Sequence, residues 1–167
     1  MPTSTLKFSG IRDNHTRGRV GDFLRTKLVK DANLSVVTAY FTIYAYARLK
    51  PELDRVGRVR LLFGEPRFVG QHDPDRDESK AFVVAPDGLA LGNRLQLKRA
   101  ARECAEWIRA KVDIRTVSQT GFLHGKLYHI ARGEVADAIL GSSNFPVPGL
   151  GLADTGNNIE LNLEVND

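Results

Sequence analysis

The chain is poor in the features that mark several classes of protein. Its 167 residues include a single cysteine, Cys104, which excludes a disulfide framework and a cysteine-built zinc site within one chain. No segment approaches the roughly 18 consecutive apolar residues of a membrane span, and residues 1–10 lack the apolar stretch of a secretory signal. We therefore expect a cytoplasmic protein without a membrane partner.

Neither sign of charge dominates the sequence. Lys and Arg number 24 against 20 Asp and Glu, a formal net charge of +4, and 42% of the residues are apolar, as in ordinary soluble domains. The small basic excess suits a polyanion such as nucleic acid, although many proteins without such a partner share it. We expect a polar, poorly ordered lead-in over 1–18 and one domain over 19–167, which ends directly after a predicted strand, as an excised piece of a longer protein would.

The hydrophobic pattern indicates an α/β fold. A nearly continuous apolar run at 34–41 and an alternating one at 58–63 predict strands, and 43–55 between them has helical spacing. This βαβ signature predicts a mixed, largely parallel sheet flanked by helices on both faces. Further helices are expected at 19–32 and 94–111, a long loop at 65–93, and strands at 112–117, 122–131, 135–141 and 159–165.

One stretch of the sequence carries candidate chemistry. On the predicted strand 122–131, His124 and Lys126 are two residues apart and so share one face. The next strand leads into Gly141–Asn144 (GSSN), which offers hydroxyl, amide and backbone N–H donors suited to an anion. Glu160, at the start of the last predicted strand, is a carboxylate that could orient an imidazole. These groups together are suited to a phosphate.

The order of these elements resembles the signature of the phospholipase D superfamily, which is H-x-K, then G-S/G-x-N, then a downstream Glu. The matching residues are His124 and Lys126, Gly141–Asn144, and Glu160. More loosely, the strand–helix–strand segment 34–64 is similar to the N-terminal phospholipase D-like domain attached to some bacterial helicases. The family usually has an Asp five residues after the Lys, where this chain has Ala131.

The resemblance implies phosphodiester cleavage without metal or other cofactor. The imidazole of His124 would attack phosphorus and form a covalent phosphohistidine, while a second histidine protonates the leaving oxygen. Lys126 and Asn144 would stabilise the developing negative charge, and Ser142 and Ser143 would bind the substrate. Glu160 would support the imidazole.

This mechanism needs two His–Lys pairs, and the chain contains one. His15 and His72 have no Lys two residues further on. We therefore expect a homodimer in which His124 of each copy faces the other, or a second motif elsewhere in a longer protein.

The resulting function prediction is a phosphodiesterase of nucleic acid, hence a nuclease, with DNA favoured over RNA. An alternative is a noncatalytic nucleic-acid-binding or dimerisation domain of a larger helicase or restriction-type enzyme. Lipid hydrolysis is a third hypothesis, which the sequence favours least.

Several residues have competing interpretations. Glu164 is an alternative to Glu160 on the same predicted strand, and His129 points to the opposite face from His124 and is expected to be structural. Cys104 lies on the apolar face of a predicted helix and is expected to be buried and inert. The acidic segment 73–78 lacks the Gly and Glu of a calcium loop, which favours a solvated loop. Four aromatic residues could stack on bases or pack in the core: Tyr40, Phe41, Tyr44 and Tyr46.

Overall fold

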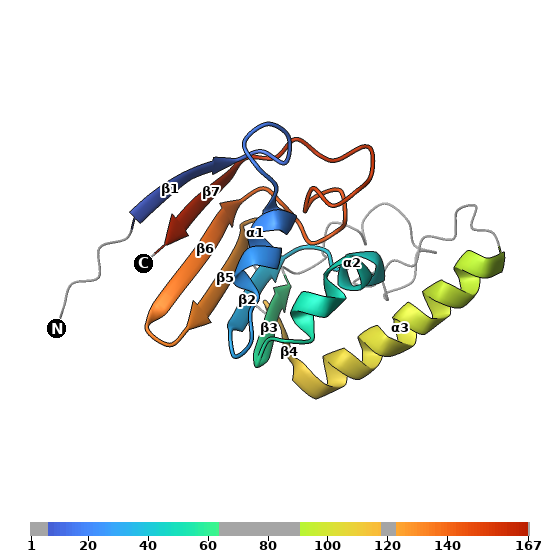
Figure 1. Cartoon of the computed structure of the whole chain (residues 1–167). Coiled ribbons are helices and arrows are strands. Elements are labelled where there is room, and N and C mark those ends of the chain that lie inside the picture. The colour runs from blue at the N-terminus through green and yellow to red at the C-terminus, as the bar shows by residue number, and fades with distance from the viewer. Residues whose placement is uncertain (1–6, 64–90, 118–122, 167) are drawn as a thin grey trace.

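One β-sheet of seven strands organises the chain. The structure is a computed structural model that describes residues 7–63, 91–117 and 123–166. Its strands are β1 (Lys7–Arg12), β2 (Asn33–Thr38), β3 (Arg58–Phe63), β4 (Val112–Thr116), β5 (Lys126–Arg132), β6 (Val135–Gly141) and β7 (Asn162–Asn166). Its helices are α1 (Val20–Lys27), α2 (Ile43–Leu53) and α3 (Leu91–Lys111). The strand order is β1-β7-β6-β5-β2-β3-β4 (Figure 1).

The sheet is mixed, as the sequence predicts, but the expectation that it is largely parallel is wrong. The β2–α2–β3 unit is confirmed, and β2 pairs with β3 and β3 with β4 in parallel. Every other pair, from β2–β5 through β5–β6 and β6–β7 to β7–β1, is antiparallel. For β5 and β6 the reason is local: a tight hairpin with Gly133 at φ +60° joins them, and such a turn reverses the chain.

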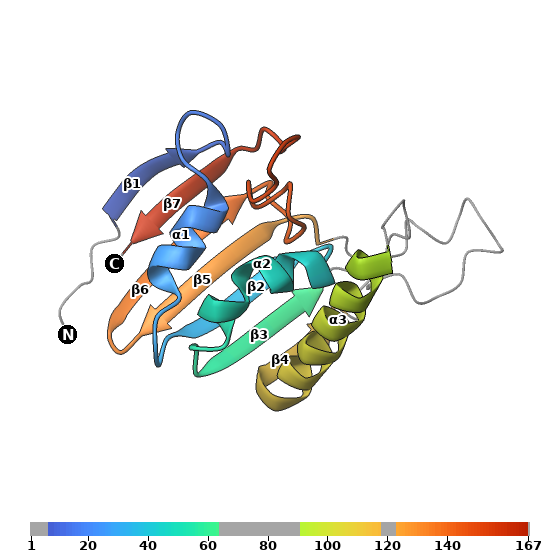
Figure 2. The same ribbon diagram turned by 45° about the vertical axis from the view of Figure 1, so that its right-hand side comes forward.

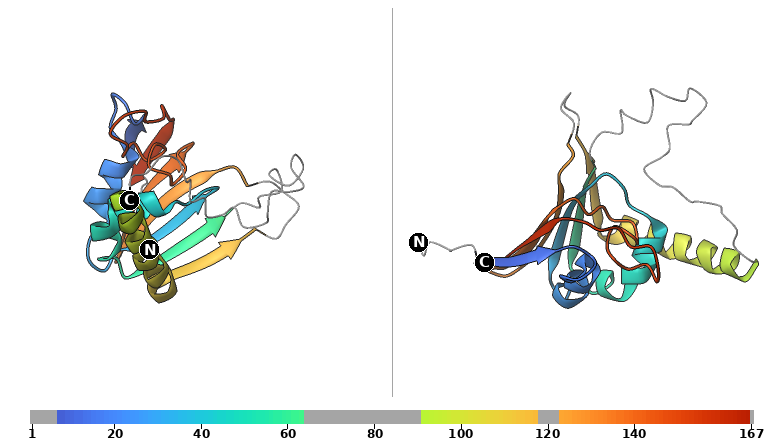
Figure 3. Two further views of the ribbon diagram at one scale, coloured as in Figure 1. Left: turned by 90° about the vertical axis from the view of Figure 1, so that its right-hand side faces the viewer. Right: turned by 90° about the horizontal axis from the view of Figure 1, so that it is seen from above.

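The core lies between the sheet and the helices. Alternate residues of the central strands are buried against α1 and α2, among them Leu34, Val36, Val59 and Leu61. Figures 2 and 3 show α1 and α2 over one face of the sheet, with α3 on the same side beside β4. Within the described residues, the expected helical cover is therefore present on one face only.

The N-terminal segment differs from the expected lead-in over 1–18. β1 adds an antiparallel edge strand beside β7, with a bulge between Phe8 and Gly10. After it, the buried Asn14 adopts φ +62°; its side chain donates to the Gly149 carbonyl and accepts from the N–H of Val20. Backbone pairing at a sheet edge needs no apolar pattern, so a periodicity search does not detect it.

The remaining differences concern element ends and unplaced residues. β5 begins at Lys126 rather than 122, and β7 at Asn162 rather than 159. Most of the predicted loop 65–93, including the acidic segment 73–78, lies outside the described residues. Cys104 is buried on α3, and burial raises the pKa of its thiol to about 11. No described helix combines the length and apolar character needed to cross a bilayer.

Candidate functional site

The candidate residues meet at one edge of the sheet. β5 runs antiparallel to both β2 and β6, and β7 runs antiparallel to β6. The carboxyl ends of β2 and β6 therefore lie at the same edge as the amino ends of β5 and β7. This topology places Thr38, Lys126, Gly141 and Asn162, which are terminal residues of these four strands, at that edge.

His124 and Lys126 occupy different surroundings. His124 precedes β5 and is exposed, whereas Lys126 is the first residue of β5 and only 5% exposed. The Lys126 ammonium donates to the carbonyl oxygen of His124 at 2.6 Å, which ties the segment before β5 to the strand. The expectation that both residues sit within one strand is therefore wrong, because the ladder starts at Lys126.

Burial changes the titration of Lys126. Desolvation lowers the pKa of its ammonium, and the negative charge of Glu160 raises it again in part. The geometry agrees: Lys126 pairs with Gly141 across β5 and β6, and the next residue, Ser142, donates to Glu160, so this carboxylate lies near the cation. The Lys126 ammonium is poorly hydrated and the Glu160 carboxylate is partly exposed. Lys126 can therefore bind an anionic group when the negative charge of Glu160 is neutralised.

The turn after β6 is held by the side chains of Asn162 and Tyr128. Asn162 is buried; its Oδ1 accepts from the N–H of Ser143, and its Nδ2 donates to the Ser143 Oγ at 2.9 Å. Tyr128, fully buried on β5, donates its hydroxyl to the Ser143 carbonyl at 2.9 Å. Ser143 itself is 0% exposed, so within this structure its contribution is to fix the shape of the turn.

Asn144 joins the same turn to the end of β2. Its Oδ1 accepts from the N–H of Ala39 at 3.0 Å and lies 3.2 Å from the Thr38 hydroxyl. Thr38 Oγ1 in turn accepts from the N–H of Phe145. Because the amide oxygen of Asn144 is engaged, its NH₂ group is the part that can donate to an anion.

Glu160 lies beside the turn, and Glu164 does not. Ser142 donates its hydroxyl to Glu160, and Asn158 Nδ2 donates to the other carboxylate oxygen at 3.1 Å. Glu164, within β7, forms an ion pair with Arg12 of β1 instead. Of the two carboxylates considered from the sequence, Glu160 is therefore the one that contacts a candidate site residue.

The absence of a side chain at Gly141 allows β6 and β7 to approach each other closely at this edge. A Cβ on Gly141 would lie 2.2 Å from the Leu161 carbonyl oxygen and 2.7 Å from the Asn162 Cα, both backbone atoms. The close approach lets the Ser142 N–H donate to Leu161 O and the Leu161 N–H donate to Ser142 Oγ. The glycine of the GSSN segment is thus required by packing.

Sequence reasoning missed the residues that support the site. Thr38, Tyr128 and Asn162 hold the turn, yet none of them belongs to the motif. Asn162 carried no signal, because the alternation of 159–165 assigns Leu161 and Leu163 to the apolar face and Asn162 to the polar one, whereas the structure exposes Leu161 and buries Asn162. A polar residue at such a position must find partners, and here they are backbone and side-chain atoms of Ser143.

Within the described residues there is no group of three or more His, Cys, Asp and Glu side chains that could hold a metal ion. The donors at this edge are an ammonium, hydroxyls and amides, which suit an anion.

Comparisons with known proteins found structural similarity alone. No protein-family model and no curated protein matches the chain. Solved structures of yeast tyrosyl-DNA phosphodiesterase match: a histidine-to-alanine mutant at 12% identity and TM-score 0.46, covering 89% of this chain and 27% of that one. A second structure of that yeast enzyme matches at 12% identity and TM-score 0.42, covering 98% of this chain and 31% of that one. The chain spans less than a third of either structure.

The negative charge of Glu160 acts on Lys126, so substitution of Glu160 should change the pKa of Lys126. Because Glu160 raises the pKa of Lys126 against the effect of burial, Glu160→Gln should lower it further, so that the ammonium loses its proton at a lower pH. NMR titration of ¹³C-labelled lysine side chains measures this directly. Glu164→Gln is the matched control, since Glu164 pairs with Arg12, and it should leave the Lys126 titration in place.

The close approach at Gly141 predicts a cost for any side chain there. Gly141→Ala must push β7 away from β6 and should lower the free energy of unfolding by about 1–3 kcal/mol. Gly125→Ala is the control, because a Cβ at Gly125 meets nothing within 4 Å. Urea unfolding compares the two; equal stability of both variants would contradict the role given to Gly141.

Proposed function

We propose that this chain is a phospholipase D-type phosphodiesterase that cleaves nucleic acid without a metal ion. The observation that carries the proposal is the arrangement at one sheet edge, where Lys126 pairs with Gly141 across β5 and β6 and the next residue, Ser142, donates to Glu160. The amide of Asn144 is fixed at the same edge by its bonds to the end of β2. These residues are the ones that the motif resemblance selects.

The proposed reaction has two steps. A ring nitrogen of His124 attacks the phosphorus, an N–P bond forms, the P–O bond to the leaving group breaks, and a second imidazolium gives its proton to that oxygen. Water then attacks the phosphorus, its proton passes to the second imidazole, and the N–P bond breaks. The Lys126 ammonium and the Asn144 NH₂ stabilise the charge that builds on the phosphoryl oxygens.

The second imidazole is assigned to His124 of a second copy. The exposed position of His124 ahead of β5 leaves it accessible to such a partner. Beside this edge, the sheet face away from the helices carries a row of aliphatic side chains. Cross-strand pairing places in this row Leu62, Val37, Leu127, Leu140, Leu163 and Ile11. Leu140 is 45% exposed, and burial of the row would favour association.

The substrate is assigned to nucleic acid, and to DNA over RNA, on the basic balance of the chain and the motif resemblance. A second candidate function is a noncatalytic nucleic-acid-binding or dimerisation domain of a larger helicase or restriction-type enzyme. One contact favours it: the Lys126 ammonium donates a hydrogen bond to the backbone carbonyl of His124, so it is already engaged within the chain.

A cleavage assay in excess EDTA separates the two functions. The wild-type protein should cut DNA, and both His124→Ala and Lys126→Ala should reduce the rate by at least about 10²-fold, as loss of one charge-stabilising donor does. His129→Ala is the matched control, because His129 lies within β5 three residues after Lys126 and so on the opposite face of the sheet. Retarded but intact DNA with every variant would favour the binding function, and cleavage that needs Mg²⁺ would contradict the mechanism.

The aliphatic row predicts how dimer and activity depend on each other. Leu140→Asp should convert a dimer into a monomer in sedimentation velocity and abolish cleavage, because a charge on the row opposes its burial. Val135→Asp, at the hairpin end of the same strand and 50% exposed, should leave the dimer intact. A fully active monomer would overturn the assignment of the second imidazole.

A further inference from the structure

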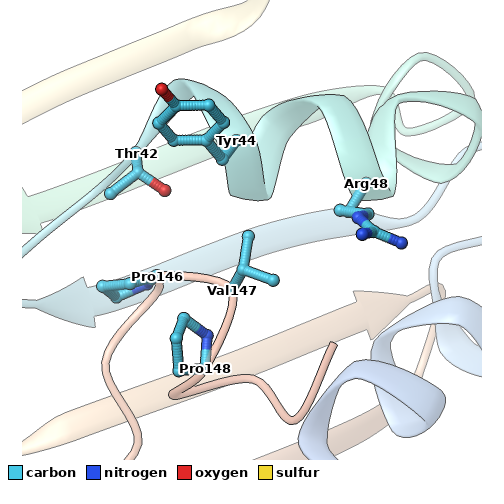
Figure 4. Close-up of a pocket in the computed structure, with 6 residues that line it drawn as sticks. All are labelled: Thr42, Tyr44, Arg48, Pro146, Val147 and Pro148. Atoms are coloured by element: carbon cyan, nitrogen blue, oxygen red, sulfur yellow. The ribbon is translucent and has the colours of Figure 1, made fainter. Parts of the chain in front are cut away.

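A pocket lies between the start of α2 and the loop that follows the GSSN turn. Its volume is about 320 Å³, within the range of small-ligand sites. Thr42, Tyr44 and Arg48 of the α2 region lie along one side, and Pro146, Val147 and Pro148 along the other (Figure 4). Most of the lining is apolar and rigid, since proline rings and an aromatic ring have few accessible conformations.

The pocket adjoins the candidate phosphate site. Pro146 follows Asn144 by two residues, so their Cα atoms are at most about 7.6 Å apart. On the opposite side, Thr42 lies three residues after Ala39, whose N–H donates a hydrogen bond to the Asn144 side chain. A ligand group attached to a phosphate at this edge can therefore reach the pocket through a short linkage.

The aromatic residues around β2 and α2 divide into two groups. Phe41 and Tyr46 are buried and pack against Trp107, so they belong to the core. Tyr44 lines the pocket, and Tyr40 is 48% exposed one residue after Ala39. Tyr40 and Tyr44 thus lie outside the core in the segment that follows Ala39, where a flat ring could stack on them.

An ion pair supplies polar groups at the pocket. The Arg48 guanidinium contacts both carboxylate oxygens of Asp154, at 2.9 and 3.4 Å, and lowers the pKa of that carboxyl. Both side chains remain partly exposed, so their donors and acceptors are accessible to the edge of a heteroaromatic ring. Stacking surfaces together with exposed hydrogen-bonding groups match a nucleobase.

We propose that the pocket between α2 and residues 146–148 binds the base of a nucleotide adjoining the reacting phosphate, with Tyr44 as its stacking residue. The inference rests on the proposed function for the identity of the substrate. A base within a duplex is stacked on its neighbours and paired, so it can enter the pocket only from a single strand or after flipping out. The preferred substrate is therefore single-stranded or locally unpaired nucleic acid.

Binding to two oligomers tests the pocket. The probes are a fluorescently labelled thymidine 10-mer and a 10-mer of tetrahydrofuran abasic units, which have the same phosphates and differ in the bases. Tyr44→Leu should weaken binding of the thymidine oligomer by about 5- to 150-fold, as expected for loss of stacking on one base, and leave the abasic affinity within twofold. Tyr44→Phe, which keeps the ring, should bind both as the wild type does.

A second pair of variants distinguishes loss of the pocket from a folding defect caused by Tyr44→Leu. Arg48→Ala removes the pocket cation, whereas Arg25→Ala removes a similarly exposed arginine that pairs with Asp22 on α1. Arg48→Ala should weaken only the thymidine oligomer, and Arg25→Ala neither. Equal losses on both oligomers, or no loss with Tyr44→Leu, would overturn the base-binding role.

Failure of the proposed function has a separate signature. If the wild-type protein binds the thymidine oligomer through Tyr44 but cuts neither oligomer in EDTA, the pocket stands and the nuclease proposal fails. If it cuts the abasic and thymidine oligomers equally well and Tyr44→Leu binds both normally, the nuclease proposal stands and the base pocket is wrong.

Discussion

The side-chain amides of Asn144 and Asn162 hold the turn after β6 between two strands, and the whole candidate site depends on where that turn lies. Asn162 bonds to the backbone and hydroxyl of Ser143, and Asn144 bonds to the end of β2. Each contact satisfies a polar group at a strand end, and a buried group left unsatisfied would cost about 1–3 kcal/mol. The clamp gives Ser142 and the Asn144 NH₂ a fixed position beside Lys126 and Glu160.

Much of the fold follows from hydrophobic periodicity. The β2–α2–β3 unit has a buried strand, an amphipathic helix with Thr42 as its N-cap, and a second strand, and all three were detectable from the sequence. The sheet direction was not, because periodicity identifies strands without their partners. β1 was missed for a related reason: its pairing with β7 joins residues about 150 positions apart through backbone hydrogen bonds.

The candidate site could be predicted from the sequence only for residues that follow the order of the motif along the chain. The motif selected Lys126, Ser142 and Glu160; the structure bonds Ser142 to Glu160 and pairs Lys126 with Gly141, the residue before Ser142. It did not select Tyr128 or Asn162, whose importance arises from contacts between separate strands. Nor could spacing show that Ser143 is buried, since that depends on how closely β6 approaches β7 at Gly141.

We propose that His124 becomes covalently bonded to phosphorus during turnover. A DNA oligomer that is cut slowly, mixed with the protein in EDTA and quenched in alkali, should leave a phosphorus–nitrogen adduct that mass spectrometry locates on the peptide containing His124. We expect this adduct to form and then decay as product appears. Steady product formation with no adduct at His124, or with the adduct on another residue, would contradict it.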